Sequence, residues 1–199
     1  MSNTAVYTAI IPDRDVTESV YPPLRQAEID RCSSERVKRE KYYVWRLLEY
    51  AISRELGEDM KNIRFEKNER GRWFSDKLFF SLSHTDRIVA VAVSDRPVGV
   101  DIEAVRRHRE GLERHILTES EMTELRELDD GKAWEYIIKR WTQKESIFKL
   151  GDRPAFEPTK IETANFPVVT RCVEYQFGKY MLSVCSEDVE NLRFEAYSF

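Results

Sequence analysis

Two acidic side chains share one face of a short predicted strand in the middle of the chain. The segment PVGVDIE alternates aliphatic residues with a glycine and two acids, Asp101 and Glu103, so as a strand it points both carboxylates to the same side. Such a pair resists ionising together unless a cation or a shared proton lies between the two groups. Mg²⁺ is the first candidate, because it prefers oxygen ligands and is commonly held by carboxylates plus substrate phosphates. The alternative is an edge strand with a solvated acidic face.

A third carboxylate, Glu145, lies on the apolar stripe of a helix predicted from about residue 133 to residue 150. The stripe consists of large apolar residues: Trp134, Ile138, Trp141 and Phe148. A carboxylate in this position has to be paired, hydrogen-bonded or bound to a metal, because burying it bare is costly. Lys149 follows one turn later on the adjacent surface. The alternative interpretation is an internal salt bridge from Glu145 to Lys149 or to Lys144.

Basic residues gather at the start of the first long predicted helix. Ser33 or Ser34 can cap this helix, and Gly57 follows its end. Its first half carries a group of cations: Arg36, Lys38, Arg39, Lys41 and Arg46. Cations oppose the positive end of the helix dipole, so this arrangement indicates a bound anion. A solvated face balanced by Glu35 and Glu40 is the alternative.

The remaining chain predicts a mixture of strands and helices. AVYTAII, LFFSLSH and IVAVAV are predicted strands, and IRFEKNERGRW is a strand that enters a turn at residues 68–71. Residues 12–23 are expected to connect elements, with Pro22 and Pro23 stopping regular structure. RRHREGLERHI is expected to be a loop or an irregular helix. Because these strands are consecutive, we expect Ser83 and His84 to meet Asp101 and Glu103 at one end of a sheet.

Two further predictions concern the C-terminal part of the chain. Thr118 and Glu121 have the spacing of a capping box, and Gly131 is expected to end the helix that they begin. VVTRCVEYQF, KYMLSVC and NLRFEAYSF are predicted strands. A hairpin with its loop at residues 178–179 would place Cys172 opposite Cys185.

Composition excludes several classes of protein. The 32 basic and 36 acidic residues give a net charge of −4, so the chain lacks the overall basic field of a nucleic-acid-binding protein. No apolar run is long enough to span a bilayer, and no secretory signal is visible. We therefore expect a cytoplasmic protein without a nucleic-acid or membrane partner, with its three cysteines as free thiols.

The order strand, helix, hairpin, strand occurs roughly twice. It predicts an α+β protein with an N-terminal half, residues 1–98, that supplies a phosphate clamp, and a C-terminal half, residues 99–199, that supplies the acids.

Three motifs in this order resemble a known family. FSLSH, PVGVDIE and WTQKESIFK are similar to the 4′-phosphopantetheinyl transferases, specifically the single-chain type that activates peptide and polyketide synthases. The resemblance implies transfer of the phosphopantetheine arm of coenzyme A to a serine of an apo acyl or peptidyl carrier protein, with release of adenosine 3′,5′-bisphosphate. It also implies Mg²⁺ as the cofactor.

The same resemblance assigns roles to the acids and to one lysine. Asp101, Glu103 and Glu145 would be the metal ligands. Glu145 or Glu103 would accept the proton of the incoming serine. Lys149 would offset charge on the pyrophosphate as the bond to the leaving nucleotide breaks.

Coenzyme A needs further cations for its phosphates. By resemblance, Ser83, His84, Arg46 and Arg72 would bind it together with Lys149. Arg72 stands where family members often have a lysine, and Trp73 replaces the proline that often follows that lysine. Less firmly matched helpers are Lys38, Arg39 and Lys41.

The implied fold is two similar α+β halves about a pseudo-twofold axis, with the active site in the cleft between them. A monomer suffices, because one chain holds both halves. A carrier would dock on the loop of residues 106–116 and the following helix. Two alternatives remain: a non-catalytic module that binds coenzyme A or carrier, and a Mg²⁺-dependent phosphoester hydrolase that uses the same acids.

Overall fold

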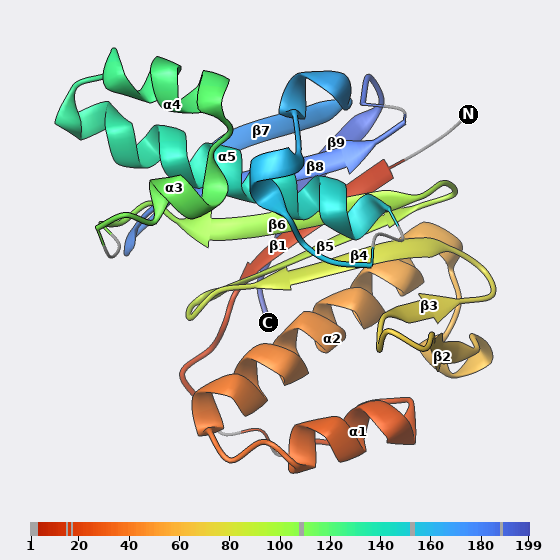
Figure 1. Cartoon of the computed structure of the whole chain (residues 1–199). Helices are drawn as coiled ribbons and strands as arrows, with labels where there is room; N and C mark the ends of the chain where they lie inside the picture. The colour runs from red at the N-terminus through yellow and green to blue at the C-terminus, as the bar shows by residue number, and fades with distance from the viewer. Residues whose placement is uncertain (1–3, 15, 17, 108–109, 152–153, 188) are drawn as a thin grey trace.

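A computed structural model describes residues 4–14, 16, 18–107, 110–151, 154–187 and 189–199 of the chain, which forms a mixed α+β protein (Figure 1). The helices are α1 (Pro23–Asp30), α2 (Glu35–Leu56), α3 (Glu113–Ile116), α4 (Glu119–Arg126) and α5 (Asp130–Leu150). The strands are β1 (Thr4–Ile10), β2 (Phe65–Lys67), β3 (Trp73–Ser75), β4 (Phe79–His84), β5 (Ile88–Ser94), β6 (Val98–Ala104), β7 (Val168–Tyr175), β8 (Gly178–Ser186) and β9 (Leu192–Tyr197). Short 3₁₀ turns cover Met60–Asn62, Pro158–Lys160 and Thr163–Asn165. None of the helices in these ranges is long and apolar enough to cross a bilayer.

The first sheet has the strand order β4-β5-β1-β9, and helix α2 packs on one of its faces (Figure 1). Strand β1 runs antiparallel to β5 and parallel to β9. Ser34 caps α2 by accepting a hydrogen bond from the Val37 amide, and Gly57 ends the helix with a φ of 66°. The predicted helix and its bounds are confirmed. Its predicted apolar stripe is also buried: Val44, Leu47, Leu48 and Ala51.

The second sheet has the order β6-β8-β7, and both of its strand pairs are antiparallel. Helix α5 packs on the face of this sheet that points away from the first sheet (Figure 1). Gly99 on β6 allows this helix to approach closely. A Cβ atom at Gly99 would lie 1.9 Å from the carbonyl oxygen of Ser146 and 2.7 Å from the amide nitrogen of Leu150. The glycine therefore fixes how near α5 lies to the strand that carries the two acids.

The two sheets are joined by an apolar layer and by two serines. Val100 and Ile102 on β6 are buried in one cluster with Val6 and Ala90 of the first sheet, which gives the layer order helix, sheet, sheet, helix. At the edge, the Ser81 hydroxyl of β4 accepts a hydrogen bond from the Val100 amide (3.0 Å). The Ser83 hydroxyl does the same for the Ile102 amide (3.2 Å). Strand β4 is thereby held in fixed register beside β6.

Two local predictions in the C-terminal part are wrong. Tyr175 pairs with Gly178, whose φ of 125° suits glycine, so the hairpin turns two residues earlier than predicted. Cys172 therefore lies opposite Met181 and not opposite Cys185, although the cysteines are free thiols as expected. The capping box at Thr118 is confirmed, but α4 ends at Arg126.

Helix boundaries near glycine and proline also differ from the expectation. Gly131 lies in the first turn of α5, where the Asp129 side chain accepts a hydrogen bond from the Lys132 amide (3.0 Å). Helix α1 was not predicted. Pro23 occupies its first turn, where the missing N–H of proline costs nothing. Strand β9 joins the sheet built from the N-terminal part, and the division of the chain at residue 98 stays a prediction.

Candidate active site

Asp101 occupies the centre of the candidate site. Its side chain is buried, and its Oδ1 atom accepts hydrogen bonds from Ser83 Oγ and from Lys149 Nζ, each at 2.7 Å. Its Oδ2 atom is also buried and has no hydrogen-bond partner among the described residues. One carboxylate oxygen is therefore fixed in place, while the other is left with an unused capacity to accept a bond or bind a cation.

Three elements bring these groups together. Asp101 comes from β6, Ser83 from the neighbouring strand β4, and Lys149 from the last turn of α5. The close approach of α5 at Gly99 places Lys149 above the strand. The sequence predicted that Ser83 and Asp101 meet at one end of a sheet. Their side chains do meet, but β4 and β6 belong to different sheets, so the hydrogen bond joins two sheets.

Glu103 and Glu145 flank Asp101 without partners of their own. Neither carboxylate has a hydrogen bond or an ion pair among the described residues. Burial, reinforced by the negative charge of Asp101, raises the pKa of Glu103 to about 7. Burial raises the pKa of Glu145, and the opposing effect of the Lys149 charge does not cancel the rise. Each of these carboxyl groups is thus destabilised in its charged form, because the nearby cations offset only part of the cost of burial.

The alternative of a structural salt bridge to Glu145 is wrong. Lys149 pairs with Asp101, and Lys144 pairs with Glu121 at 2.5 Å. The buried face of α5 is also displaced from the predicted stripe, because Thr142, Ser146 and Ile147 are buried while Phe148 is only partly buried. Glu145 therefore lies at the boundary of the buried face of α5, on the same side of the helix as Phe148.

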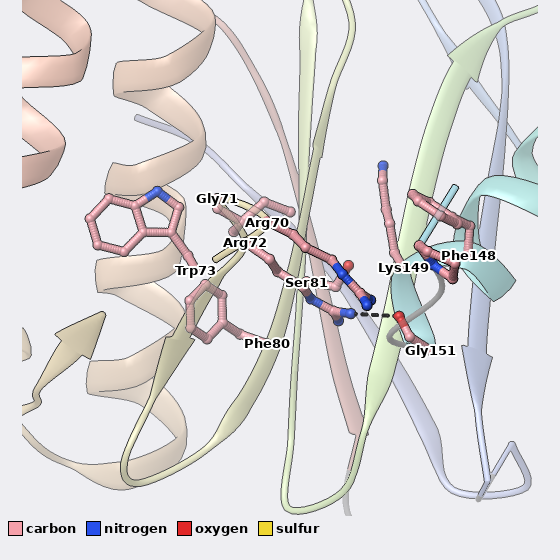
Figure 2. Close-up of a pocket in the computed structure, with 11 residues that line it drawn as sticks. Arg70, Gly71, Arg72, Trp73, Phe80, Ser81, Phe148, Lys149 and Gly151 are labelled. Carbon is pink, nitrogen blue, oxygen red and sulfur yellow. Dashed lines mark hydrogen bonds between the residues drawn. The ribbon is translucent and has the colours of Figure 1, made fainter. Parts of the chain in front are cut away.

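A pocket of about 390 Å³ opens beside Lys149, between the turn before β3, strand β4 and the end of α5 (Figure 2). This volume is within the range of small-molecule sites. Arg70, Arg72 and Lys149 line it with positive charge, and Arg72 donates a hydrogen bond to the Gly151 carbonyl at 2.9 Å (Figure 2). Its apolar walls include Trp73, Phe80 and Phe148. The predicted site residue Arg72 is therefore brought to the same pocket as Lys149.

A second, basic pocket adjoins the first, and Gly71 and Trp73 line both. Its cations come mainly from α1 and the neighbouring elements: Arg25, Arg31, Lys41 and Lys67. Glu28 compensates part of this charge through ion pairs with Arg25 and Lys67. Sequence reasoning proposed Lys41 as a helper but missed the other three. The available signal was PPLRQAEIDR, in which a proline can begin a helix and Arg25 and Arg31 lie six residues apart.

His84 lies next to Glu40 of α2, with 3.3 Å between His84 Nδ1 and Glu40 Oε2. Burial and the positive charges of Lys149, Arg25 and Lys41 lower the pKa of His84 to about 4. The imidazole is therefore neutral at pH 7 and can donate one hydrogen bond. His84 therefore lies near the cations of the site: Lys149, Arg25 and Lys41.

The basic residues predicted on α2 are not all gathered here. Arg46 pairs with Glu18 (3.2 Å) and Glu49 (3.1 Å) and lines other pockets, beside Tyr197. Its role in binding coenzyme A stays a prediction. Lys38 and Arg39 pair with acids at the protein surface, as a solvated helix face would.

Asp101, Glu103 and Glu145 are the side chains that could hold a divalent cation. As the side chains stand, the described residues contain no group of three metal-binding side chains close enough to hold an ion. The chemistry of the donors nevertheless suits one, because Asp101 Oδ2 is unused and the pKa values of Glu103 and Glu145 are raised. All three are oxygen ligands of the kind that Mg²⁺ prefers. At present the Lys149 ammonium compensates Asp101.

Residues 97–197 match the sequence model of the 4′-phosphopantetheinyl transferase superfamily. This match covers half of the chain and includes Asp101, Glu103, Glu145 and Lys149. The chain belongs to this superfamily.

Individual superfamily members also match parts of the chain. The chain is 34% identical over 99 residues to the 4′-phosphopantetheinyl transferase gsp of Aneurinibacillus migulanus. These 99 residues are 49% of this chain and 42% of gsp. It is 29% identical over 106 residues to the transferase Sfp of Bacillus subtilis (strain 168), which covers 52% and 47%. A longer match, to the transferase ffp of Bacillus subtilis, is 27% identical over 145 residues and covers 64% and 65%. The matches to gsp and Sfp thus span about half the length of these transferases.

Proposed function

We propose that this superfamily member transfers the 4′-phosphopantetheine arm of coenzyme A to a serine of an apo acyl or peptidyl carrier protein, with release of adenosine 3′,5′-bisphosphate. The observation that carries the proposal is Asp101, which has one oxygen fixed by Ser83 and Lys149 and the other unused. Beside it lie two uncompensated carboxyl groups and a cationic pocket. Phosphoryl transfer depends mainly on positioning and charge neutralisation, which such an arrangement supplies.

Asp101, Glu103 and Glu145 would hold Mg²⁺, since they are oxygen donors on β6 and on the facing helix α5. When bound, the ion neutralises pyrophosphate oxygens and lowers the cost of charge in the transition state. Glu103 or Glu145 would accept the proton of the carrier serine.

Lys149 would exchange its partner during catalysis. It is bonded to Asp101 and is partly exposed at the pocket, with 27% of its side chain accessible. The Lys149 ammonium would then donate to the phosphate whose bond breaks, and a cation held by the three acids would supply the charge that Asp101 needs. Charge stabilisation of this kind is usually among the largest contributions to catalysis.

The two adjoining pockets suit the two charged parts of coenzyme A. The pyrophosphate would lie against Lys149 and Arg72 in the first pocket. The 3′-phosphate would bind in the basic pocket, near Arg31 and Lys41, with Trp73 between the two. Ser83 serves the site by holding Asp101, to which its hydroxyl is already bonded.

Two aspects of the wider architecture follow from the same proposal. Each half would contribute one long helix on one antiparallel pair of strands, α2 on β4 and β5, and α5 on β6 and β8. This repetition supports a pseudo-twofold arrangement with the active site between the halves. A single chain then suffices as a monomer. The cytoplasm is the expected compartment.

The carrier would dock on the loop of residues 106–116 and on α4. Residues 108–109 of this loop lie outside the described part of the chain. A hollow there is lined by Arg114 and Arg126, by the apolar residues Leu117 and Met122, and by two acids, Glu119 and Glu162. Its two arginines would pair with acidic residues of a carrier helix, and its apolar residues would pack against that helix. Arg114→Glu should raise KM for the carrier without changing the affinity for coenzyme A, and an unchanged carrier KM would exclude this surface.

Intact-protein mass spectrometry tests the function directly. Apo acyl and peptidyl carriers are incubated with the protein, coenzyme A and Mg²⁺, with EDTA as the control. A mass gain of one phosphopantetheine arm that disappears with EDTA is the expected result. Cleaved coenzyme A with unmodified carrier would indicate a hydrolase, and bound but intact coenzyme A would indicate a binding module.

A further inference from the structure

Lys144 is a lysine with a completely buried side chain on α5, directly before Glu145. Its ammonium group donates three hydrogen bonds: to the Ile116 carbonyl (2.8 Å), to Glu121 Oε2 (2.5 Å) and to the Pro158 carbonyl (3.0 Å). An ammonium has three N–H donors, so every one is used. The directions of three bonds fix the position of the side chain far more strictly than apolar packing would.

The three acceptors come from three different segments around the helix. Ile116 ends α3, Glu121 lies in the first turn of α4, and Pro158 begins the 3₁₀ turn that follows α5. Glu121 is itself fixed, because Oε2 also accepts a hydrogen bond from the Thr118 amide (3.0 Å) in the capping box. Lys144 thus ties α5 to the chain that precedes it and to the chain that follows it.

Gly99 holds the helix from another side. Because a Cβ there would meet the Ser146 carbonyl oxygen at 1.9 Å, the backbone of α5 already lies against β6 and cannot move nearer. This contact limits the approach of the helix but does not by itself prevent rotation about the helix axis. A rotation of about 10° shifts a side-chain tip by ~1 Å, given a helix radius with side chains of about 5–6 Å. Glu145 and Lys149 would both move by this amount relative to Asp101.

We propose that Lys144 is a positioning residue that sets the rotation of α5 and so aligns Glu145 and Lys149 with Asp101. The proposal rests on the proposed transferase function. A displacement of about 1 Å in a catalytic group can cost ~100-fold in rate. Lys144 itself does not touch the reacting groups, because all three of its donors are occupied by Ile116, Glu121 and Pro158.

Two variants separate positioning from stability. Lys144→Met removes the three bonds, and the double variant Lys144→Met/Glu121→Gln also removes the buried charge left unpaired, while the glutamine oxygen can still accept the hydrogen bond from the Thr118 amide. We expect both variants to lower kcat at least about tenfold per folded molecule, with KM for coenzyme A within about twofold. The folded fraction is measured by circular dichroism. Leu48 is a buried residue of α2, far from α5 in sequence. Leu48→Ala is the matched control: it should destabilise the fold but leave kcat per folded molecule unchanged.

Hydrogen exchange of the ligand-free protein provides a readout that does not depend on activity. The amides in the last two turns of α5 should exchange at least about tenfold faster in both variants, and not in Leu48→Ala. A double variant with wild-type kcat and wild-type exchange would overturn the proposal. If the unaltered protein transfers nothing to any carrier, the proposed function fails, and the exchange measurement alone decides whether Lys144 positions the helix.

Discussion

Lys149 Nζ lies 2.7 Å from Asp101 Oδ1, and this ion pair joins the last turn of α5 to the middle of β6. The pair spans 48 residues of sequence, and its lysine lines the pocket that Arg72 also lines. It compensates the one buried acid of the site, while Glu103 and Glu145 have no hydrogen-bond or ion-pair partner among the described residues. The site as it stands is therefore short of positive charge, which a metal ion and the exchange of Lys149 to a phosphate would correct.

Lys149→Ala should lower kcat by about 100-fold and change KM for coenzyme A by only a few-fold, because the lysine acts on charge that develops in the transition state. Steady-state kinetics with an apo carrier measures both constants. Lys139→Ala, on an exposed face of the same helix, is the matched control and should behave as the unaltered protein. A change confined to KM would make Lys149 a binding residue instead.

Gly99→Ala should destabilise the protein by about 1–3 kcal/mol, because its Cβ would meet backbone atoms of α5 that cannot move separately. Urea denaturation measures the loss in the free energy of unfolding. Gly131→Ala is the matched control, since its Cβ would meet only the Asp129 side chain at 3.2 Å in the first turn of the same helix. Alanine favours helix, so this control should be neutral or more stable by up to ~1 kcal/mol. Equal effects of the two substitutions would contradict the close approach at Gly99.

Arg31→Ala should raise KM for coenzyme A by about tenfold, since a charge-assisted bond to phosphate contributes roughly 1.5–3 kcal/mol. With dephospho-coenzyme A, which lacks the 3′-phosphate, the same substitution should have little effect. Arg54→Ala, at the far end of α2, serves as the control. If Arg31→Ala weakened both substrates equally, the basic pocket would not be the 3′-phosphate site.

His84 should make the stability of the ligand-free protein depend on pH. Its pKa is lowered to about 4 in the folded chain, against about 6.5 when unfolded. The unfolded state therefore binds a proton first, so the stabilisation is complete above pH 6.5 and is lost as the pH falls towards 4. Because the side chain is partly exposed, the loss is about 1 kcal/mol after allowance for solvent screening. His84→Gln should lose about 1 kcal/mol less than the unaltered protein between pH 6.5 and pH 4 in urea titrations. Parallel curves for the two proteins would contradict a neutral His84.

Much of the site could be predicted because its residues lie in regular elements with clear periodicity. The alternation in PVGVDIE places Asp101 and Glu103 on one face, and the structure has Val100 and Ile102 in the core between the sheets as that alternation requires. The long helix α2 was equally clear, since a capping serine and a left-handed glycine mark its ends.

What the sequence did not predict depends on contacts between distant segments. No local pattern pairs Lys144 with Glu121 or Lys149 with Asp101, and the i, i+4 spacing of Glu145 and Lys149 suggested the wrong salt bridge. Helix α1 and the basic pocket were not predicted, because two consecutive prolines usually interrupt regular structure although proline also fits the first turn of a helix. The hairpin register at Cys172 failed because a single glycine does not show on which side of it the turn lies.

Asp101→Asn provides the most direct test of the central claim, which is that this carboxylate anchors a cation for phosphopantetheine transfer. The amide oxygen can still accept the bonds from Ser83 and Lys149, while the charge is removed and the unused Oδ2 is replaced by an amide nitrogen that cannot bind a cation. Carrier modification is followed by intact-protein mass spectrometry, and coenzyme A binding by calorimetry with and without Mg²⁺. We predict a fall in kcat/KM of about 1,000-fold or more and the loss of Mg²⁺-dependent binding of coenzyme A. An Asp101→Asn protein that modifies its carrier within tenfold of the normal rate would contradict the account.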